Sequence, residues 1–362
     1  MRLTFLLRND GMAGGNKVVA IYSERLRRRG HHVTVVAGRL PKQSLLRRVR
    51  LFLLGHGWQM NPSAAPSYFD DLSVPLHVLE ASRPILDSDV PDGDVVIATW
   101  WETAEWVNGL SSKKGAKVYF IQHHEIFSYL PVERCRATYR LPLRKIVISS
   151  WLKNAMKEIY QDDSSYLIPN SVEISQFFAP PREKSKVPTV GLLYSTATFK
   201  GMEILLSALG ELKKLIPSVR GVAFGSEPLS AHFPLPDWVD FHYLPPQDSI
   251  RLLYEKCDVW VCGSWSEGFH LPPLEAMACR CPLVSTRVGG PLDVVKDGVN
   301  GFLVEVGDFS SLAERAATVL QMNEHDWKEM SDSALNTALA YSWDDATDLF
   351  ERTLLELATI PT

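Results

Sequence analysis

The sequence predicts an α/β protein built from two doubly wound parallel-sheet domains. Short apolar runs, typical of buried strands, alternate along the chain with longer amphipathic segments that are typical of helices. Such alternation indicates parallel βαβ units. The pattern is interrupted at 178–188, where three prolines lie among charged residues, and it then starts again. A length of 362 residues allows each half its own hydrophobic core.

The first domain is predicted over residues 1–175. Its strands are expected at 3–7, 32–37, 95–99, 117–122 and 145–149, with a short last strand at 168–172. A glycine-containing loop at 9–16 follows the first strand, and a helix is expected over 18–29. We expect ligands near the carboxyl ends of these strands, where doubly wound sheets receive them.

The second domain is predicted over residues 186–340. Its strands are expected at 190–194, 219–224, 241–244, 259–262 and 283–286, and its helices at 203–215, 310–321 and 324–340. An amphipathic segment at 344–357 lies within 341–362, which we predict to be a helix that packs back towards the first domain. Two Rossmann-like domains facing each other across a cleft are the expected architecture.

Composition narrows the class of protein. The chain is 46% hydrophobic and 22% charged, with a net charge of −4, which does not suggest a nucleic-acid binder. Its five cysteines form no C-x-x-C pair, so we expect buried, reduced thiols in a cytoplasmic protein, with no metal site and no disulfide framework. The apolar run at 3–7 is too short for a signal sequence or a membrane span.

Two glutamates eight positions apart, Glu267 and Glu275, bracket the most informative segment. It follows the apolar run 259–262, contains Gly268, and continues into a predicted helix whose first turn suits Pro272 and Pro273. Glu275 is therefore expected near a helix N-terminus, where a carboxylate is favoured. Carboxylates repel phosphate but accept hydrogen bonds from sugar and ribose hydroxyls. The alternative is a surface loop with two solvated acids.

Residues 266–278 resemble the signature of the retaining, GT-B-fold glycosyltransferases of family four, also called glycosyl transferases group 1. The similarity extends to further short segments, at 168–170, 199–201, 282–285, 288–291 and 297–304, and to the loop with Gly14 and Gly15. It covers the predicted second domain and is sparse in the first. The resemblance implies the GT-B fold, with a nucleotide sugar bound by the second domain and an acceptor bound by the first.

The resemblance also implies roles for matching positions. Glu275 would accept hydrogen bonds from the ribose, and Glu267 would contact hydroxyls of the donor sugar. Backbone amides would hold sugar hydroxyls and phosphate at Gly268, Phe269, His270 and Leu271. The amides of Gly14 and Gly15 would approach the diphosphate, since a side chain there would block it. The alternative for the glycines is an ordinary flexible turn between strand and helix.

Lys200 precedes Gly201 at the start of a predicted helix and would neutralise the leaving diphosphate. The sequence departs from the family here, because the arginine that commonly precedes this lysine is absent from 192–199. The candidates to replace this arginine are the hydroxyl groups of Tyr194, Ser195 and Thr196, and the guanidinium group of Arg287. A solvated lysine is the alternative to the phosphate-binding role.

The resemblance also implies a histidine or polar residue close to the reacting sugar, at the end of a strand in the first domain, and His123 is the candidate. It follows the predicted strand 117–122, and His124 and Glu125 are the alternatives. Adjacent residues point apart and no third ligand is evident, so we expect no metal site and no obligatory metal cofactor. A structural role for all three residues is the remaining alternative.

The chain has no acidic residue between Arg25 and Phe69, although nine basic residues lie there. Within this stretch, residues 39–54 mix arginines with bulky apolar side chains, a composition that suits an anionic membrane surface. The protein would then be cytoplasmic and peripheral on the inner face of a membrane, where it could reach a lipid-linked acceptor. The alternative is a solvated helix.

The function that the resemblance implies is that of a retaining glycosyltransferase. It would move a sugar from a nucleoside diphosphate to a hydroxyl of a saccharide or lipid-linked acceptor, in surface polysaccharide or glycolipid biosynthesis. A GT-B-fold sugar-nucleotide epimerase and a catalytically silent sugar-nucleotide-binding protein are the alternatives. A phosphorylase on this scaffold usually needs a pyridoxal cofactor and a much longer chain. The sequence does not identify the base, the sugar or the acceptor.

Overall fold

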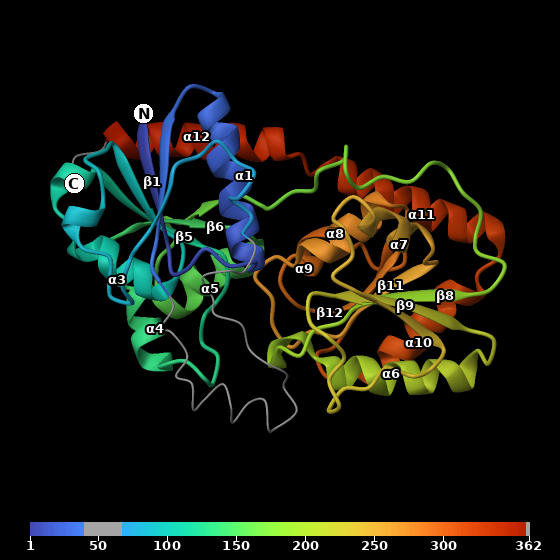
Figure 1. Ribbon diagram of the computed structural model, residues 1–362. Coiled ribbons are helices and arrows are strands. Elements are labelled where there is room, and N and C mark those ends of the chain that lie inside the picture. The colour runs from blue at the N-terminus through green and yellow to red at the C-terminus, as the bar shows by residue number, and fades with distance from the viewer. Residues whose placement is uncertain (40–66, 360–362) are drawn as a thin grey trace. The chain divides into compact units, whose positions relative to one another are not determined.

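The computed structural model describes residues 1–39 and 67–359, which form two compact units (Figure 1). Unit 1 comprises Met1–Val147, Ala155–Ile168 and Thr347–Thr362, and unit 2 comprises Ile148–Asn154 and Pro169–Ala346. Each unit is a parallel sheet covered by helices, which confirms the predicted fold class. Most of the basic segment 39–54 lies outside the described residues. Among those described, no helix is long and apolar enough to span a membrane.

The sheet of unit 1 has the strand order β3-β2-β1-β4-β5-β6-β7. Its strands are β1 (Arg2–Leu7), β2 (His32–Ala37), β3 (Leu76–Val78), β4 (Val95–Ala98), β5 (Ala116–Ile121), β6 (Arg144–Val147) and β7 (Tyr166–Leu167). All neighbours are parallel, and Leu3 of β1 lies opposite Val33 of β2 and Val95 of β4. The strands are nearly continuous apolar runs because helices cover both faces.

Helices pack on both faces of this sheet. They are α1 (Gly14–Arg28), α3 (Trp101–Gly109), α4 (Val132–Thr138), α5 (Ser150–Tyr160) and α12 (Trp343–Thr359), with short 3-10 helices η2 (Asp87–Asp89) and η3 (Ser112–Lys114). Consecutive residues of β5 show the alternation of a strand. Phe120 contacts Tyr22 of α1, whereas Tyr119 stacks on Tyr139 at the end of α4.

The sheet of unit 2 has the order β10-β9-β8-β11-β12-β13. Its strands are β8 (Thr189–Leu193), β9 (Arg220–Gly225), β10 (Val239–Tyr243), β11 (Val259–Cys262), β12 (Leu283–Thr286) and β13 (Gly301–Val304). In both units the first strand in sequence lies inside the sheet, and the order reverses beside it. These switch points, between β1 and β4 and between β8 and β11, are where doubly wound sheets bind ligands.

The helices of unit 2 are divided between the two faces of its sheet. They are α6 (Met202–Leu215), α7 (Ile250–Glu255), α8 (Leu271–Ala278), α9 (Pro291–Val294), α10 (Phe309–Gln321) and α11 (Glu324–Leu339), with the 3-10 helix η4 (Thr198–Lys200). Figure 1 shows α6 and α10 together on one face, with α7, α8 and α11 on the other. Trp327 of α11 is fully buried in the core of this unit.

The strands predicted from the sequence agree with the structure to within two residues at each end, with one exception. The strand expected at 168–172 is instead β7, at Tyr166–Leu167, because Pro169 has no N–H to continue the ladder. Strands β3 and β13 were not predicted. Helix α1 begins at Gly14, earlier than expected, because the apolar periodicity that predicted it starts only at Val18.

The C-terminal helix α12 forms part of the core of unit 1. Phe350 is fully buried, and its ring stacks on Tyr22 of α1 at a centroid distance of 4.3 Å. Polar contacts surround this stack: Glu351 pairs with Arg29 at 2.7 Å and with His31 at 2.6 Å. Unit 1 therefore needs residues from both ends of the chain.

Replacing Phe350 by alanine should lower the free energy of unfolding by about 3–5 kcal/mol, since the change removes a fully buried ring from a stacked cluster. Urea denaturation followed by tryptophan fluorescence measures the effect. Leu355→Ala on the same helix is the matched control, because that side chain is 47% exposed and its removal should cost little. Equal losses in the two variants would contradict this packing.

Candidate functional site

The candidate site of unit 2 lies at the carboxyl ends of β8 and β11, at the switch point of the sheet. One segment, 194–201, follows β8. The other, which we call the β11–α8 loop, comprises residues 263–270. The structure brings most of the predicted residues of this domain to these two segments and the start of α8: Ser195, Thr196, Lys200, Glu267, Gly268, Phe269, His270, Leu271 and Glu275.

Glu267 is a buried carboxylate, 4% exposed, in the β11–α8 loop. Its Oε1 accepts hydrogen bonds from Lys200 Nζ at 2.8 Å and from Ser264 Oγ at 2.7 Å. Burial raises the pKa of Glu267, but the neighbouring charges of His270 and Lys200 outweigh it and bring the pKa down to about 2. The carboxylate is therefore ionised at neutral pH, and its Oε2 receives no hydrogen bond from any described residue.

Two glycines join the segments that follow β8 and β11. Gly201 has a φ of 62°, and a Cβ there would lie 1.9 Å from the carbonyl oxygen of Gly263. The backbone N–H of Trp265 also donates to the carbonyl of Phe199, at 2.8 Å. This close approach of two backbones brings Lys200 to Glu267, which lies 67 positions away in sequence.

A second glycine pair, Gly289 and Gly290, fixes the β11–α8 loop from the other side. A Cβ on Gly290 would lie 2.3 Å from the carbonyl oxygen of Phe269, and one on Gly289 would lie 2.8 Å from Glu267 Cβ. Gly290 N–H donates to that Phe269 oxygen at 2.8 Å. The sequence offered these glycines only as part of the family resemblance, and the contact with Glu267 required the fold.

Glu275 lies on α8 and is 7% exposed. Its Oε2 accepts a hydrogen bond from Tyr254 OH of α7 at 3.0 Å. Glu275 is the fifth residue of α8, one turn into the helix as the sequence predicted. Tyr254, which the sequence did not single out, orients the carboxylate.

The candidates to replace the missing arginine are largely engaged elsewhere. Thr196 donates to the carboxylate of Glu227 through its N–H, at 3.0 Å, and through its hydroxyl. Arg287 pairs with Glu305 at 3.0 Å. Tyr194 and Ser195 also have partners: Tyr194 OH donates to Phe233 O at 3.1 Å, and Ser195 Oγ accepts from Ala197 N at 3.3 Å. Lys200 also has a partner, Glu267, and its contact with a phosphate stays a prediction.

Gly14 and Gly15 open helix α1 in unit 1. The preceding residue, Ala13, provides no side-chain cap, and the first turn contains no acid, so backbone N–H groups are available to an anion. A Cβ on Gly15 would lie 3.2 Å from the Gln122 side chain, whereas a Cβ on Gly14 would meet nothing within 4 Å. A side chain at position 15 would therefore require Gln122 to shift by a few tenths of an ångström, whereas a requirement for glycine at position 14 would come from a ligand.

His123 and its two alternatives, His124 and Glu125, differ in burial and in their hydrogen-bond partners. His124 is buried, its Nε2 lies 2.6 Å from Tyr160 OH, and burial lowers its pKa to about 4. Glu125 is also buried, accepts from Trp101 N–H at 2.7 Å, and has its pKa raised by burial. His123 is half-buried, and its Nδ1 lies 3.1 Å from His124 O, an acceptor, so Nδ1 carries the proton of the neutral ring.

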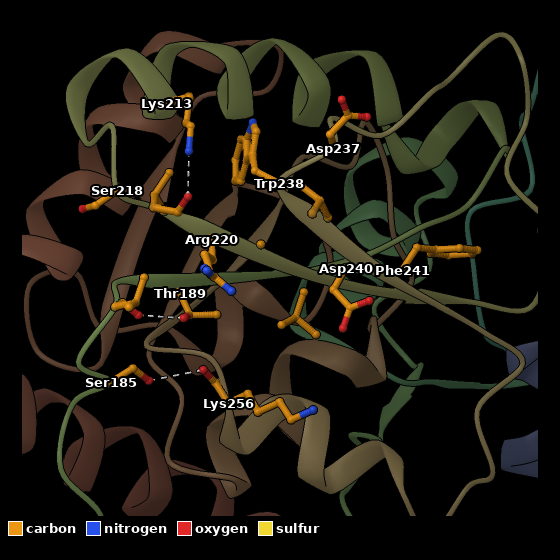
Figure 2. A pocket seen from close by; sticks show the side chains of 15 residues that line it. Ser185, Thr189, Lys213, Ser218, Arg220, Asp237, Trp238, Asp240, Phe241 and Lys256 are labelled. Atoms are coloured by element: carbon orange, nitrogen blue, oxygen red, sulfur yellow. Dashed lines mark hydrogen bonds between the residues drawn. The ribbon is translucent and has the colours of Figure 1, made fainter.

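No three His, Cys, Asp or Glu side chains in the described parts of the chain are placed to hold a metal ion. A hollow of about 1000 Å³ lies elsewhere on unit 2 (Figure 2). It is lined at the amino ends of the strands by Thr189, Arg220 and Val239, the first residues of β8, β9 and β10. It therefore lies at the opposite end of the sheet from Glu267 and does not include the candidate site.

Comparisons with known proteins agree with this geometry. Residues 173–334 match the family model described as glycosyl transferases group 1. D-inositol 3-phosphate glycosyltransferase from Mycolicibacterium vanbaalenii is 34% identical over 169 residues, which cover 45% of this chain and 36% of that protein. Sucrose synthase from Acidithiobacillus caldus is 37% identical over 98 residues, 26% of this chain and 12% of that protein. The matched stretches thus span about a third or less of these relatives.

Solved structures extend the likeness to the whole fold. Anabaena Alr3699/HepE in complex with UDP-glucose has a TM-score of 0.73 at 18% identity, covering 98% of this chain and 100% of that chain. The two doubly wound parallel sheets and this likeness show a GT-B fold. Within it, residues 173–334 match the family model of the glycosyl transferases group 1, which confirms the resemblance seen in the sequence.

The lowered pKa of Glu267 predicts a pH-dependent contribution to stability. Because its pKa in the folded protein, about 2, lies below the ordinary value of 4.5, the stabilisation is complete above about pH 4.5 and is lost as the pH falls towards 2. Between pH 6 and pH 3, the wild type should therefore lose about 2 kcal/mol more than Glu267→Gln. Denaturant unfolding of both proteins across this range measures it, and a constant difference would contradict the prediction.

Proposed function

We propose that the chain is a glycosyltransferase that moves a sugar from a nucleoside diphosphate to a hydroxyl group, with retention of the anomeric configuration. One observation carries the proposal: Glu267 is a buried, ionised carboxylate with Oε2 open, held next to Lys200 at a ligand-binding switch point. A carboxylate accepts hydrogen bonds from sugar hydroxyls, and the adjacent ammonium offsets the charge of a diphosphate. A carboxylate next to an ammonium therefore suits a ligand that carries both a sugar and a diphosphate.

The proposed roles follow the geometry of each group. Glu267 holds hydroxyls of the donor sugar, and Glu275, oriented by Tyr254, accepts hydrogen bonds from the ribose. When the bond between sugar and diphosphate breaks, Lys200 and the backbone amides of 268–271 offset the charge that develops on the leaving group. In unit 1, the amides at the start of α1 receive the diphosphate, and His123 faces the reacting sugar. No step requires a bound metal.

Relatives support the class of donor. The first relative described above is a glycosyltransferase, and HepE has been solved with UDP-glucose. We therefore infer a nucleoside diphosphate sugar as donor and take UDP-sugars as the first to test. A non-catalytic binding protein is the second candidate, favoured by the missing arginine and by the engagement of Thr196 with Glu227.

Replacing Glu267 or Glu275 by glutamine should lower turnover by about a hundredfold or more while the fold is kept, since each change removes a charged acceptor from the donor site. A thermal-shift screen of UDP-, GDP- and ADP-sugars first identifies the donor, because a ligand that binds the folded state raises Tm. Release of nucleoside diphosphate with an acceptor mixture then gives the rate.

Glu329→Gln is the matched control for these variants. The Glu329 side chain is 71% exposed on α11, so its replacement should leave the rate unchanged. A wild-type rate in either site variant would show that the site is assigned wrongly. Donor binding without transfer or hydrolysis would favour the non-catalytic candidate, and nucleotide release without an acceptor product would favour an epimerase.

We further propose a saccharide or lipid-linked acceptor used in surface polysaccharide or glycolipid assembly, with the protein cytoplasmic and peripheral on the membrane. The membrane association in this proposal rests on the arginines and apolar residues of 39–54 in the sequence. The acceptor class and the pathway rest on the family resemblance. In liposome sedimentation, the protein should partition to anionic vesicles more than to neutral ones, and added salt should reduce the difference. A variant with the arginines of this segment replaced by glutamine is the control. Equal partitioning of the unmodified protein to anionic and neutral vesicles would contradict the proposed membrane association.

A further inference from the structure

Cys262 is placed differently from the other cysteines of the chain. All five are described, buried and free of disulfides. Burial raises the pKa of the thiols of Cys135, Cys257, Cys279 and Cys281. Cys262 ends β11, directly before the β11–α8 loop, and its thiol faces an imidazole.

His270 is the partner of this thiol. Its Nδ1 lies 3.2 Å from Cys262 Sγ and 3.6 Å from Glu267 Oε1. The His270 side chain is only 4% exposed, and its Nε2 is buried without a hydrogen-bond partner among the described residues. The backbone of His270 has a φ of 71°, a left-handed conformation that costs free energy for a residue with a side chain. The loop thus retains a strained residue whose ring reaches the thiol.

The charges around this pair favour a thiolate. Burial raises the pKa of Cys262, but the charge of His270 and a hydrogen bond from its ring outweigh burial and lower the pKa to about 7. Glu267 opposes the thiolate, and Lys200, which faces Glu267, offsets part of that charge. Ser264 Oγ lies 3.5 Å from Cys262 Sγ. A substantial fraction of thiolate is therefore present at neutral pH, and the thiolate is the nucleophilic form.

We propose that the contact between the Cys262 thiol and the His270 ring makes Cys262 a modification site for small electrophilic sulfur compounds, namely thiosulfonates and disulfides. The thiolate attacks the electrophilic sulfur and a new S–S bond forms. The sulfinate or thiolate of the reagent leaves with the electron pair of the broken bond. The reagent must be small, because Cys262 is only 3% exposed.

Modification of Cys262 disables the β11–α8 loop. The added group occupies the 3.2 Å contact between Cys262 and His270, so the ring must move. Its neighbour Glu267 then loses a charge that keeps it ionised, and the pairing with Lys200 is disturbed. Loss of donor binding rests on the proposed function, whereas the reactivity of the thiol does not.

Labelling of the full chain with methyl methanethiosulfonate tests the site. Peptide mass mapping follows all five cysteines at once, so the other four are internal controls. Cys262 should react at least about tenfold faster than any other cysteine, with a rate that rises with pH around a midpoint of about 7. A Cys262 that stays unlabelled until the protein is unfolded would overturn the proposal and identify an ordinary core cysteine.

Two variants distinguish activation of the Cys262 thiol by the imidazole from simple access of the reagent to the thiol. His270→Asn removes the ring while asparagine tolerates the left-handed backbone, so the loop should keep its fold. It should slow labelling of Cys262 at pH 7 by about tenfold or more. His242→Asn, on β10 of the same unit, is the matched control and should leave the rate unchanged. Equal rates in the wild type and His270→Asn would contradict the pair.

A binding measurement tests the consequence. Labelled protein should lose the thermal shift given by the nucleotide sugar, dithiothreitol should restore it, and Cys262→Ser should be insensitive to the reagent. Labelled protein that still binds the donor would overturn the claim that the loop is disabled. Selective labelling in a protein that binds no nucleotide sugar would support the modification site and contradict the proposed function, so the two failures are distinguishable.

Discussion

The ion pair between Lys200 and Glu267 is the interaction on which the candidate site depends. Each partner follows a different strand, and both are more than three-quarters buried. A buried charge without a partner is costly, so removal of either residue would leave the other in an unfavourable state. The pair therefore requires the backbones after β8 and β11 to approach closely, and the glycines at 201 and 263 permit this approach.

The geometry serves two chemical tasks within a small volume. A carboxylate with one oxygen held by protein donors and the other open can receive a hydroxyl, and the ammonium next to it can receive a phosphate. The same network includes His270 and Cys262, so the site and the reactive thiol share their electrostatics. Modification of the Cys262 thiol is expected to displace the His270 ring and so to change the electrostatic surroundings of the Glu267 carboxylate.

Much of the architecture followed from the sequence. Strand β11 was predicted at its observed bounds because four consecutive apolar residues form a buried parallel strand. Glu267 and Glu275 were singled out because acids flank a glycine and a helix start. Glu275 lies one turn into α8 as predicted, because Pro272 and Pro273 suit the first turn of a helix. The sequence placed Gly14 in a loop rather than in the first turn of α1.

The sequence by itself determined the alternation of strands and helices and the residue types of the site, because periodicity and short motifs are local properties. Only the tertiary structure decided which residues meet. Tyr254 reaches Glu275, Gly290 supports Phe269, and His270 contacts Cys262 through approaches between separate elements. The surroundings of His123, His124 and Glu125 also differ for this reason, because burial and hydrogen-bond partners depend on the packing of α3, α4 and α5 around β5. Such contacts arise from the packing of whole elements, which no local pattern specifies.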